Sequence, residues 1–384
     1  MKAIPFNRPF LAGTELGYVR EAAERGGLES GGPFTARCEG WLADATGAER
    51  ALLSHSGTGA LEAAMMLAGL APGDEAIMPS FAYPTMATAV VRQGAIPVFV
   101  DVDPRTLNLD PAEVKKAVGP RTKAIVAVHY GGVGCEMDEL LEIAAPAGLV
   151  VIEDAAHCLL ATYRDRPLGT LGDLGTFSFH HTKNVISGEG GALLVNNPAL
   201  LERAEVVWEK GTDRKRFERG ETDRYTWVDI GSSFAASELT AAFLWGQLEA
   251  AEEITRRRRE IWGRYHEGFA EPEAEGLAQR PVVPAGHTHN GHLYYLILPT
   301  ASARDAFIAA MRAEGIATSF HYVPLHSSPA GGRFGRPIGD LAQTEQLSRR
   351  LVRLPLWTGL DRDSVARIID VAGTALSDVA SSRA

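Results

Sequence analysis

One lysine of the chain stands where a predicted strand ends and a glycine-rich turn begins. Lys183 is the last residue but one of the segment FSFHHTKN, and residues 188–191, GEGG, follow it. Lysine is rarely buried, so a solvated surface position is the simplest explanation of a single lysine. In a partly desolvated pocket, however, a lysine has a lowered pKa and becomes an amine nucleophile. Its position beside the turn makes Lys183 the first candidate for covalent chemistry.

A second candidate is the carboxylate at the end of an apolar run. Asp154 ends the strand-like part of VVIEDAAHC, and His157 follows three residues later. A carboxylate at the end of a buried strand is costly unless it has a cationic partner or hydrogen bonds. Asp154 could equally cap the next turn, and His157 could either face the same cavity or be structural.

A candidate anion site lies earlier in the chain. Ser56-Gly57-Thr58-Gly59 follows a short apolar run and opens an alanine-rich helix. Exposed amides at a helix N-terminus bind anions, and glycine permits close approach. The alternative is a plain helix N-cap. No lysine follows the glycines, so the motif is not a P-loop.

Together these features match the requirements of pyridoxal phosphate (PLP). The cofactor needs a lysine for its imine, a carboxylate opposite its pyridine nitrogen, a phosphate site and a flat group against its ring. Along the chain, the anion site at Thr58 supplies the phosphate site, Asp154 supplies the carboxylate, and Lys183 supplies the lysine. The sequence therefore predicts PLP as the cofactor.

The elements that must position these residues alternate along the first half of the chain. Short β-branched runs predict strands at 75–79, 96–102, 123–128 and 149–153, and Ala/Leu-rich patterns predict helices at 59–70, 85–93 and 137–147. Such alternation predicts a largely parallel sheet that is covered on both faces. Ligands then bind beyond the carboxyl ends of the strands.

The second half of the chain is organised differently. A charged segment over 209–225 is predicted to be a long excursion, and a helix over about 236–264 to lead into a second domain. We predict a large domain over 1–250 and a small C-terminal α/β domain over 251–384, which would hold a strand at 293–298 and helices at 302–314 and 363–377.

Composition limits the classes of protein. The 384 residues are 45% hydrophobic and 22% charged, as in an ordinary globular protein. A net charge of -10 argues against a nucleic-acid partner. No apolar stretch reaches the length of about 20 residues that a membrane span needs. Three widely spaced cysteines favour neither a disulfide framework nor a zinc site, so a cytoplasmic location is expected.

The motifs SGTGAL, MPSFAY, VVIEDAAH, FSFHHTKN and GEGG make the chain resemble the nucleotide-sugar aminotransferases among the fold type I PLP enzymes. The resemblance implies an α/β fold: a large domain with a mainly parallel seven-stranded sheet, and a smaller C-terminal α/β domain. The segments AVHYGGVGCEMD, EKGTDRKRF, YTWVDIGSS and FHYVPLHSSPAG are most similar to the dTDP-4-amino-4,6-dideoxygalactose transaminases. The implied substrates are dTDP-4-keto-6-deoxyglucose and L-glutamate.

The resemblance also implies a role for individual residues. Lys183 would form the imine and move the proton, and Asp154 would pair with the pyridinium nitrogen. Tyr83 would stack on the ring, and His157 would lie near the ring oxygen or on the other ring face. The residues that would hold the phosphate are Gly57, Thr58 and Ser178.

Other residues are implied in the dimer and in sugar binding. Family members are homodimers with shared active sites, and Ser233 would replace the asparagine through which a partner chain contacts the phosphate. The residues implied to bind the diphosphate or the sugar are Lys210, Arg219, Tyr322 and His326. Alternatively, the first two lie in a solvated charged loop and the last two in a domain interface.

Several alternatives stay open at this point. The turn after Lys183 is one residue shorter than in galactose-forming relatives, so the gluco product remains beside the preferred galacto product. A 3-keto sugar aminotransferase, a sugar 3-dehydratase and a catalytically silent PLP-binding regulatory protein are further candidates. A metal site would need ligands drawn from His129, Asp154, His157 and His180, which lack the helical spacing of ligand pairs.

Overall fold

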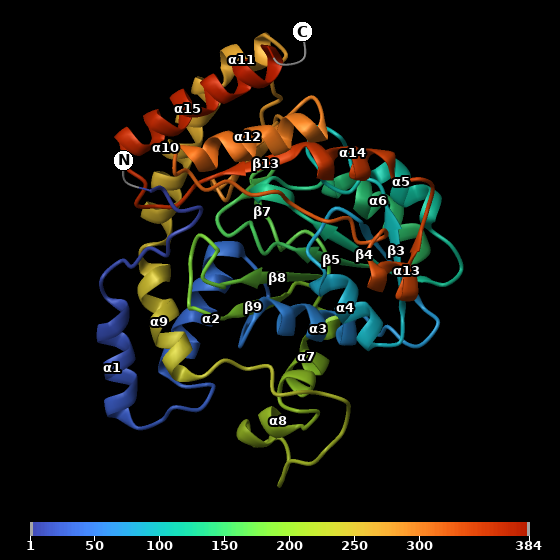
Figure 1. The fold of residues 1–384 in the computed structure, drawn as a ribbon. Coiled ribbons are helices and arrows are strands. Elements are labelled where there is room, and N and C mark those ends of the chain that lie inside the picture. The colour runs from blue at the N-terminus through green and yellow to red at the C-terminus, as the bar shows by residue number, and fades with distance from the viewer. Residues whose placement is uncertain (1–2, 382–384) are drawn as a thin grey trace.

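The computed structural model describes residues 3–381 and is built on an eight-stranded sheet (Figure 1). The strand order is β1-β9-β8-β5-β4-β2-β3-β12, and only β9 runs antiparallel to its neighbours. The strands are β1 (Arg50–Ser54), β2 (Glu75–Pro79), β3 (Ile96–Val100), β4 (Thr122–Val128), β5 (Val150–Asp154), β8 (Leu174–Ser178), β9 (Gly191–Val195) and β12 (Arg336–Pro337).

Helices cover both faces of this sheet, because successive side chains of a strand point to opposite faces. In β2, Ile77 belongs to the core on one face, whereas Ala76 and Met78 belong to the core on the other. The first face is covered by α2 (Pro33–Thr46), α5 (Pro111–Ala117), α6 (Met137–Ala147) and α9 (Glu238–Glu249). The second is covered by α3 (Gly57–Leu67), α4 (Thr85–Arg92) and α7 (Leu201–Trp208). The predicted α/β fold with a mainly parallel sheet is confirmed.

The sheet has one strand more than the seven predicted. Strand β12 comes from the C-terminal half and pairs in parallel with β3. Arg336 on β12 forms an ion pair of 2.7 Å with Glu75 at the start of β2, whose side chain is buried. A two-residue strand that contains a proline gives no β-propensity signal, which explains why the sequence pattern does not predict it.

The C-terminal half builds a second, smaller layer (Figure 1). Strands β11 (Tyr294–Ile297) and β13 (Leu351–Leu354) pair antiparallel, and Ile4 from the N-terminal segment joins the core beside them. The helices of this half are α10 (Ala251–Gly268), α11 (Ala270–Ala274), α12 (Ala301–Ala313), α13 (Pro329–Phe334), α14 (Ala342–Arg350) and α15 (Arg362–Ser381).

The helix predicted over 236–264 is in fact two helices, α9 and α10, which meet at Ala250. Ala250 has a non-helical φ/ψ pair, so the hydrogen-bonded helix is interrupted there. The predicted domain boundary near residue 250 falls at this break and stays a prediction.

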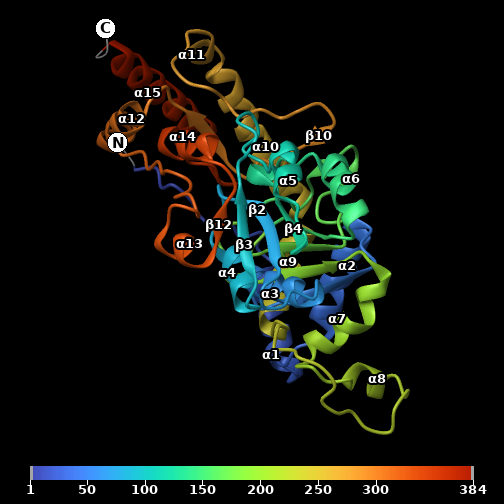
Figure 2. The ribbon, with the colours of Figure 1, turned by 90° about the vertical axis from the view of Figure 1, so that its right-hand side faces the viewer.

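A segment over residues 209–230 projects away from the sheet (Figure 2). It leaves α7, forms the short helix α8 (Arg214–Glu218) and returns to the body beside β1. The remaining elements are α1 (Glu15–Arg25), two 3-10 helices (Tyr130–Gly132 and Pro198–Leu200) and a small sheet of β10 (His287–Thr288), β6 (Thr162–Tyr163) and β7 (Arg166–Pro167). No helix within residues 3–381 is long and apolar enough to cross a bilayer.

Candidate active site

A cavity of about 610 Å³ opens where the parallel strands end. Val128, Asp154 and Ser178, the last residues of β4, β5 and β8, all line it. The N-terminus of α3 contributes a further wall, and the residues just before β11, the loop after α12 and strand β13 close the far side. The position at the carboxyl ends of the strands agrees with the expectation from the alternating pattern. A volume of this size is typical of a small-molecule site.

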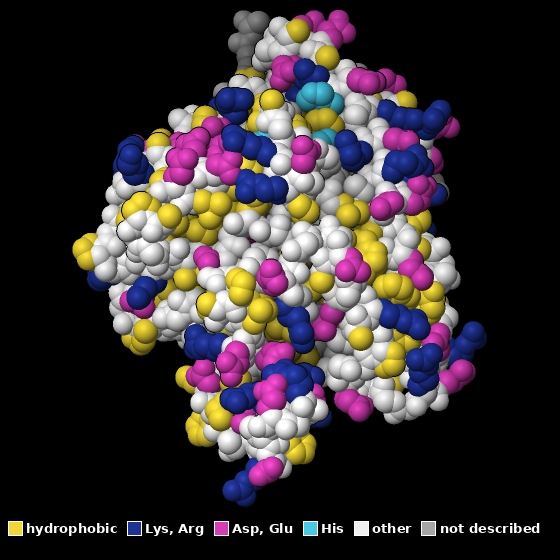
Figure 3. Space-filling view, turned by 180° about the vertical axis from the view of Figure 1, so that it is seen from behind, with side chains coloured by type: hydrophobic (Ala, Val, Ile, Leu, Met, Phe, Trp, Pro, Cys, Tyr) yellow, Lys and Arg dark blue, Asp and Glu magenta, His cyan; other side chains and the backbone are white. Residues whose placement is uncertain are grey.

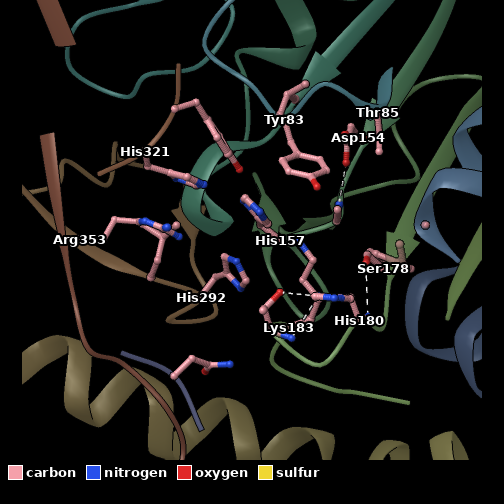
Figure 4. Close-up of a pocket in the computed structure, with 18 of the residues that line it drawn as sticks. Tyr83, Thr85, Asp154, His157, Ser178, His180, Lys183, His292, His321 and Arg353 are labelled. Carbon is pink, nitrogen blue, oxygen red and sulfur yellow. Dashed lines mark hydrogen bonds between the residues drawn. The ribbon is translucent and has the colours of Figure 1, made fainter. Parts of the chain in front are cut away.

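Lys183 reaches into this cavity, where its side chain is partly buried. Burial lowers the pKa of its amine to about 8, and the carboxylate of Asp154 partly opposes this shift. Figure 4 shows the Lys183 side chain pointing toward the space between Asp154, Tyr83 and His157. With this pKa, about a tenth of the amine is neutral at pH 7, far more than at the usual pKa of 10.5, so it is available as a nucleophile.

Asp154 lines the same cavity and is partly buried. Burial raises the pKa of its carboxyl group, while the backbone N–H of Ala156, which donates to Oδ1 at 3.1 Å, and the charge of Lys183 oppose the rise. The carboxylate has only this one hydrogen bond among the described residues. It therefore has acceptor capacity left for a cationic group of a ligand.

The start of α3 forms an anion-binding cradle. Ser56 caps the helix by accepting a hydrogen bond of 3.0 Å from the backbone N–H of Gly59. A Cβ on Gly57 would come within 2.9 Å of the Cβ of Ser178, so only glycine allows this approach of helix and strand end. Gly57, Thr58 and Ser178 all line the cavity. Their amide and hydroxyl donors, together with the positive end of the helix dipole, favour a phosphate.

Two histidine rings stack inside the cavity. His157 and His292 lie 4.0 Å apart between ring centroids, at an interplanar angle of 20°. Burial lowers the pKa of both imidazoles well below the usual value, so both are neutral at pH 7. His292 also contacts Asn184 Oδ1 through Nδ1 at 2.9 Å, which fixes its ring orientation. The pair presents a flat neutral surface close to Lys183.

Two tyrosines of the predicted set also line the cavity. Tyr83 is 61% exposed, and its ring centroid lies 6.4 Å from that of Tyr322. Burial raises the pKa of the Tyr322 hydroxyl well above the usual value, so this hydroxyl stays protonated. Tyr83 is thus an exposed ring at the mouth, free to meet a ligand.

Four predicted site residues lie outside the cavity in this chain. Lys210 and Arg219 belong to the projecting segment, where Arg219 pairs with Glu205 and Glu221. Ser233 is exposed at the base of that segment. His326 contacts Ser80 Oγ at 2.7 Å instead.

The cavity includes functional groups that the sequence patterns do not predict. They come mainly from the C-terminal half and include Thr85, Arg258, His292, His321 and Arg353. One signal was available: Arg353 interrupts the otherwise apolar strand LVRL. An arginine inside such a strand calls for a partner or a ligand.

His129, considered as a metal ligand, faces away from the cavity. Its Nε2 lies 2.8 Å from Glu153 Oε2, and its Nδ1 accepts a hydrogen bond of 3.0 Å from the backbone N–H of Cys135. Both ring nitrogens are therefore used in the core beneath the sheet.

The residues of the cavity fit PLP. A partly buried lysine with a lowered pKa, a carboxylate with free acceptor capacity, and a helix N-terminus with a cradle that a Cβ would fill lie around one space. These groups match the aldehyde, the ring nitrogen and the phosphate of the cofactor.

Solved structures share this fold over nearly the whole chain. The aminotransferase TlmJ from Streptoalloteichus hindustanus has a TM-score of 0.90 and 32% identity, with 98% of this chain and 100% of that chain covered. The putative sugar aminotransferase Spr1654 from Streptococcus pneumoniae, in its PLP form, has a TM-score of 0.90 and 25% identity, again with 98% and 100% covered.

Sequence relatives agree with the structural ones. GDP-perosamine synthase of Caulobacter vibrioides is 34% identical, over 94% of this chain and 95% of that protein. The dTDP-4-dehydro-2,3,6-trideoxy-D-glucose 4-aminotransferase of Saccharopolyspora spinosa is 33% identical, over 96% and 95%. A model of the DegT/DnrJ/EryC1/StrS aminotransferase family matches residues 10–372. The chain therefore belongs to this family and is a sugar aminotransferase that uses pyridoxal phosphate.

Proposed function

We propose that the enzyme transfers the amino group of L-glutamate to C4 of dTDP-4-keto-6-deoxy-D-glucose, giving a dTDP-4-amino-4,6-dideoxyhexose with the galacto configuration. The observation that carries this proposal is the full-length similarity, at 33% identity, to a relative whose name specifies both a dTDP sugar and amination at position 4. The segments EKGTDRKRF and YTWVDIGSS support the same subgroup.

In this proposal Lys183 is the group that bonds to the cofactor and moves the proton. Bound PLP supplies an electron-accepting ring. Lys183 Nζ holds or releases a proton near neutral pH because burial lowers its pKa to about 8. Asp154, at the end of β5, keeps the ring nitrogen protonated. A general acid–base group of this kind contributes about 10²- to 10⁴-fold to a rate.

The remaining cavity residues orient the cofactor and exclude water. Gly57, Thr58 and Ser178 hold the phosphate in the cradle at the start of α3, and Tyr83 stacks on the ring from the exposed side. His157 faces the ring from the other side or its oxygen, and its neutral imidazole adds no competing charge. The support for these roles is the common cavity that the five residues line.

The proposal includes a homodimer whose partner chain completes each site. The projecting segment exposes large apolar side chains, with Trp227 at 77% and Ile230 at 68% exposure. Figure 3 shows charged side chains of both signs crowded on the same projection. Exposed apolar side chains beside paired charges suit a protein–protein interface. In this arrangement Ser233 reaches the phosphate of the partner's site, and Lys210 and Arg219 approach its nucleotide sugar. Tyr322 contacts the sugar inside the cavity, and His326, which lies outside the cavity beside Ser80, meets the part of the substrate that extends beyond it.

Free, buried cysteines fit a reducing compartment, so a cytoplasmic location remains part of the proposal.

Regiochemistry tests the substrate. Purified enzyme loaded with PLP is given L-glutamate and, in parallel, 3-keto and 4-keto dTDP-6-deoxyhexoses. We expect faster amination of the 4-keto sugar, because a displacement of the ketone by about 1 Å costs about 100-fold in rate. Preference for the 3-keto sugar would contradict the assignment, and NMR of the product distinguishes the galacto from the gluco configuration.

Mixed dimers test the shared site. Combining Lys183→Ala chains with Ser233→Ala chains places both defects in one site and leaves the other site complete. We expect the mixture to bind cofactor more tightly than the Ser233→Ala homodimer, in one of its two sites. An active monomer in sedimentation at the assay concentration would contradict the dimer.

A further inference from the structure

The ring of His157 is covered on one face by a second ring. His292, which lies just before β11, stacks on it with 4.0 Å between the ring centroids and 20° between the ring planes. Both rings are partly buried and line the cavity. Figure 4 shows them near the Lys183 side chain, in the part of the pocket between Arg353 and Ser178. Because His292 covers one face of His157, a ligand can meet only the rest of the His157 ring.

Asn184, the residue after Lys183, fixes the orientation of His292. Its Nδ2 donates to the carbonyl of Asn290 at 3.0 Å, so its Oδ1 is the atom that lies 2.9 Å from His292 Nδ1. An amide oxygen only accepts, so His292 carries a proton on Nδ1. Burial lowers the pKa of this imidazole well below the usual value, so Nε2 carries none. The buried amide of Asn184 therefore selects one orientation and one tautomer of the His292 ring.

Asn290 holds the backbone that carries His157. It is 1% exposed, and its Nδ2 donates to the carbonyls of His157 at 2.8 Å and Leu159 at 2.9 Å. The backbone N–H of Gly131 donates to His157 Nδ1 at 3.4 Å, so the proton of this neutral ring is on Nε2. Three segments that are distant in the sequence thus meet beside Lys183, and their polar groups fix one arrangement.

The other ring beside His157 does not give the same support. Tyr130 meets His157 edge-on, with 6.4 Å between the centroids and 67° between the planes. Its hydroxyl contacts His321 Nδ1 at 3.0 Å, which fixes Tyr130 toward a different part of the cavity. Among residues 3–381, His292 is therefore the side chain that stacks face to face on His157.

We propose that His292 and Asn184 are positioning residues: Asn184 fixes the His292 ring, and this ring holds His157 in one orientation toward the cofactor. The inference rests on the proposed function, because the role of His157 at the cofactor ring is taken from there. Asn184 directly follows Lys183, so its hydrogen bond to His292 also ties the lysine segment to the wall that faces the cofactor. The stacked pair should contribute about two- to tenfold to cofactor affinity, the range for aromatic pairs.

Two substitutions at His292 separate the ring from its hydrogen bond. His292→Gln keeps a donor for Asn184 but removes the ring, whereas His292→Phe keeps a ring but removes the donor. Equilibrium dialysis gives the Kd for PLP, and the absorbance maximum reports the surroundings of the lysine-bonded cofactor. We expect His292→Gln to raise the Kd about three- to tenfold and to shift the maximum. His292→Phe should change the Kd less than about threefold and keep the maximum.

A double-mutant cycle tests whether Asn184 acts through His292. Asn184→Leu alone should raise the Kd for PLP about threefold, because His292 loses its hydrogen-bond partner. In His292→Phe this hydrogen bond is already absent, so adding Asn184→Leu should change the Kd less than about 1.5-fold. Two effects that simply multiply would show that Asn184 acts independently of His292 and would overturn its role.

The tautomer of His292 is read by NMR of holoenzyme that contains isotope-labelled histidine. His292, assigned by the signal that disappears in His292→Phe, should have its proton on Nδ1. Asn184→Leu should remove this preference, because the acceptor is lost. A proton on Nε2 of His292 in the wild type would contradict the role of Asn184.

His266→Gln is the matched control, because His266 also stacks on a ring but lies outside the cavity. Its partner is Trp262, with 4.6 Å between the centroids and 17° between the planes. Both Gln variants should lower the melting temperature to a similar extent, but only His292→Gln should change the Kd for PLP and the absorbance maximum. Unchanged cofactor binding and absorbance in His292→Gln, or equal changes in both variants, would overturn the inference.

Failure of the proposed function would give a different result. An aminotransferase reaction has two half-reactions, and the first transfers the amino group of glutamate to the cofactor. Wild type with the expected His292 tautomer and with the expected loss of PLP affinity in His292→Gln, but without this half-reaction, would contradict glutamate as the donor. The positioning role of His292 and Asn184 would stand in that case.

Discussion

The cavity and the projecting segment both contain charged residues, but the two regions differ in how far these side chains are buried and paired. In the cavity, Lys183, Asp154 and Arg353 are partly buried, and desolvation shifts the pKa of each. In the projecting segment, Arg219 is exposed and bonded to Glu205 at 2.7 Å and to Glu221 at 2.6 Å. The first set lacks full compensation by the protein, whereas the second is neutralised by its neighbours.

This contrast separates groups prepared for a ligand from groups that solubilise a surface. A buried charge without a partner destabilises the folded protein, so such charges are found mainly where a ligand supplies the partner. Exposed ion pairs contribute little to stability, and salt screens them. A role for the projecting segment in catalysis would therefore have to come from a second chain that covers it, whereas the cavity has its reactive groups within one chain.

The largest effect is expected at Lys183. Lys183→Ala removes both the nucleophile and the proton carrier, so turnover should fall at least about 1,000-fold, within the range for acid–base groups. The visible absorbance that the cofactor shows when bonded to the lysine should disappear as well. Lys116→Ala is the matched control, because Lys116 is exposed on α5 and pairs with Glu113. Turnover near the wild-type level without added amine would exclude Lys183 from the reaction.

The next largest effect is expected at Asp154. Asp154→Ala removes the buried partner of the protonated ring nitrogen, and losing one member of such a pair costs about 3–5 kcal/mol. Equilibrium dialysis should show weaker cofactor binding, and stopped-flow absorbance should show slower proton transfer. Asp138→Ala, which removes a partly exposed carboxylate outside the cavity that pairs with Arg164 and Arg166, should change neither quantity. Wild-type cofactor affinity and rate in Asp154→Ala would place Asp154 outside the site.

A moderate effect is expected from pH. The pKa of Lys183 is lowered to about 8, so its amine is neutral above that pH rather than above the usual value near 10.5. The rate at which apoprotein captures PLP should rise about tenfold between pH 7 and 9 and level off above pH 8, because the neutral fraction saturates there. A rate still rising tenfold per pH unit at pH 9 would show that the amine is not desolvated.

The residues that could be predicted from the sequence are those that a local pattern places. Asp154 follows an apolar strand, Lys183 precedes a glycine-rich turn, and Gly57 opens a helix after a strand. Because parallel strands share one carboxyl edge, these three positions converge without knowledge of the tertiary packing. The alternating pattern predicts the central strands nearly to the residue: the prediction of 75–79 coincides with β2, Glu75–Pro79.

The remaining part of the cavity could not be predicted in this way. His292, His321 and Arg353 lie more than 100 residues after Lys183 and reach the cavity only because the C-terminal half packs against the sheet. Strand β12 joins the sheet through the ion pair of Arg336 with Glu75 rather than through propensity. Contacts of this kind depend on tertiary structure. Arg353, a charged residue within the apolar strand LVRL, is the one sequence feature that indicates them.

The smallest effect is expected at Arg219, and it tests the contrast between the two regions. Arg219→Gln removes an exposed guanidinium with two carboxylate partners, so the melting temperature should stay within error, as is usual for surface pairs. If the segment approaches the nucleotide sugar of a partner chain, KM for the dTDP sugar should rise about threefold. That rise should shrink at high salt, because exposed charges are screened, and the glutamate half-reaction should not change. Arg256→Gln, at an exposed arginine of α10 paired with Glu253 and Glu260, is the matched control and should leave KM unchanged. Equal KM values for Arg219→Gln and Arg256→Gln, with the dimer intact, would restrict sugar recognition to the cavity. A rise in KM for Arg219→Gln alone would make the projecting segment part of the active site of the neighbouring chain.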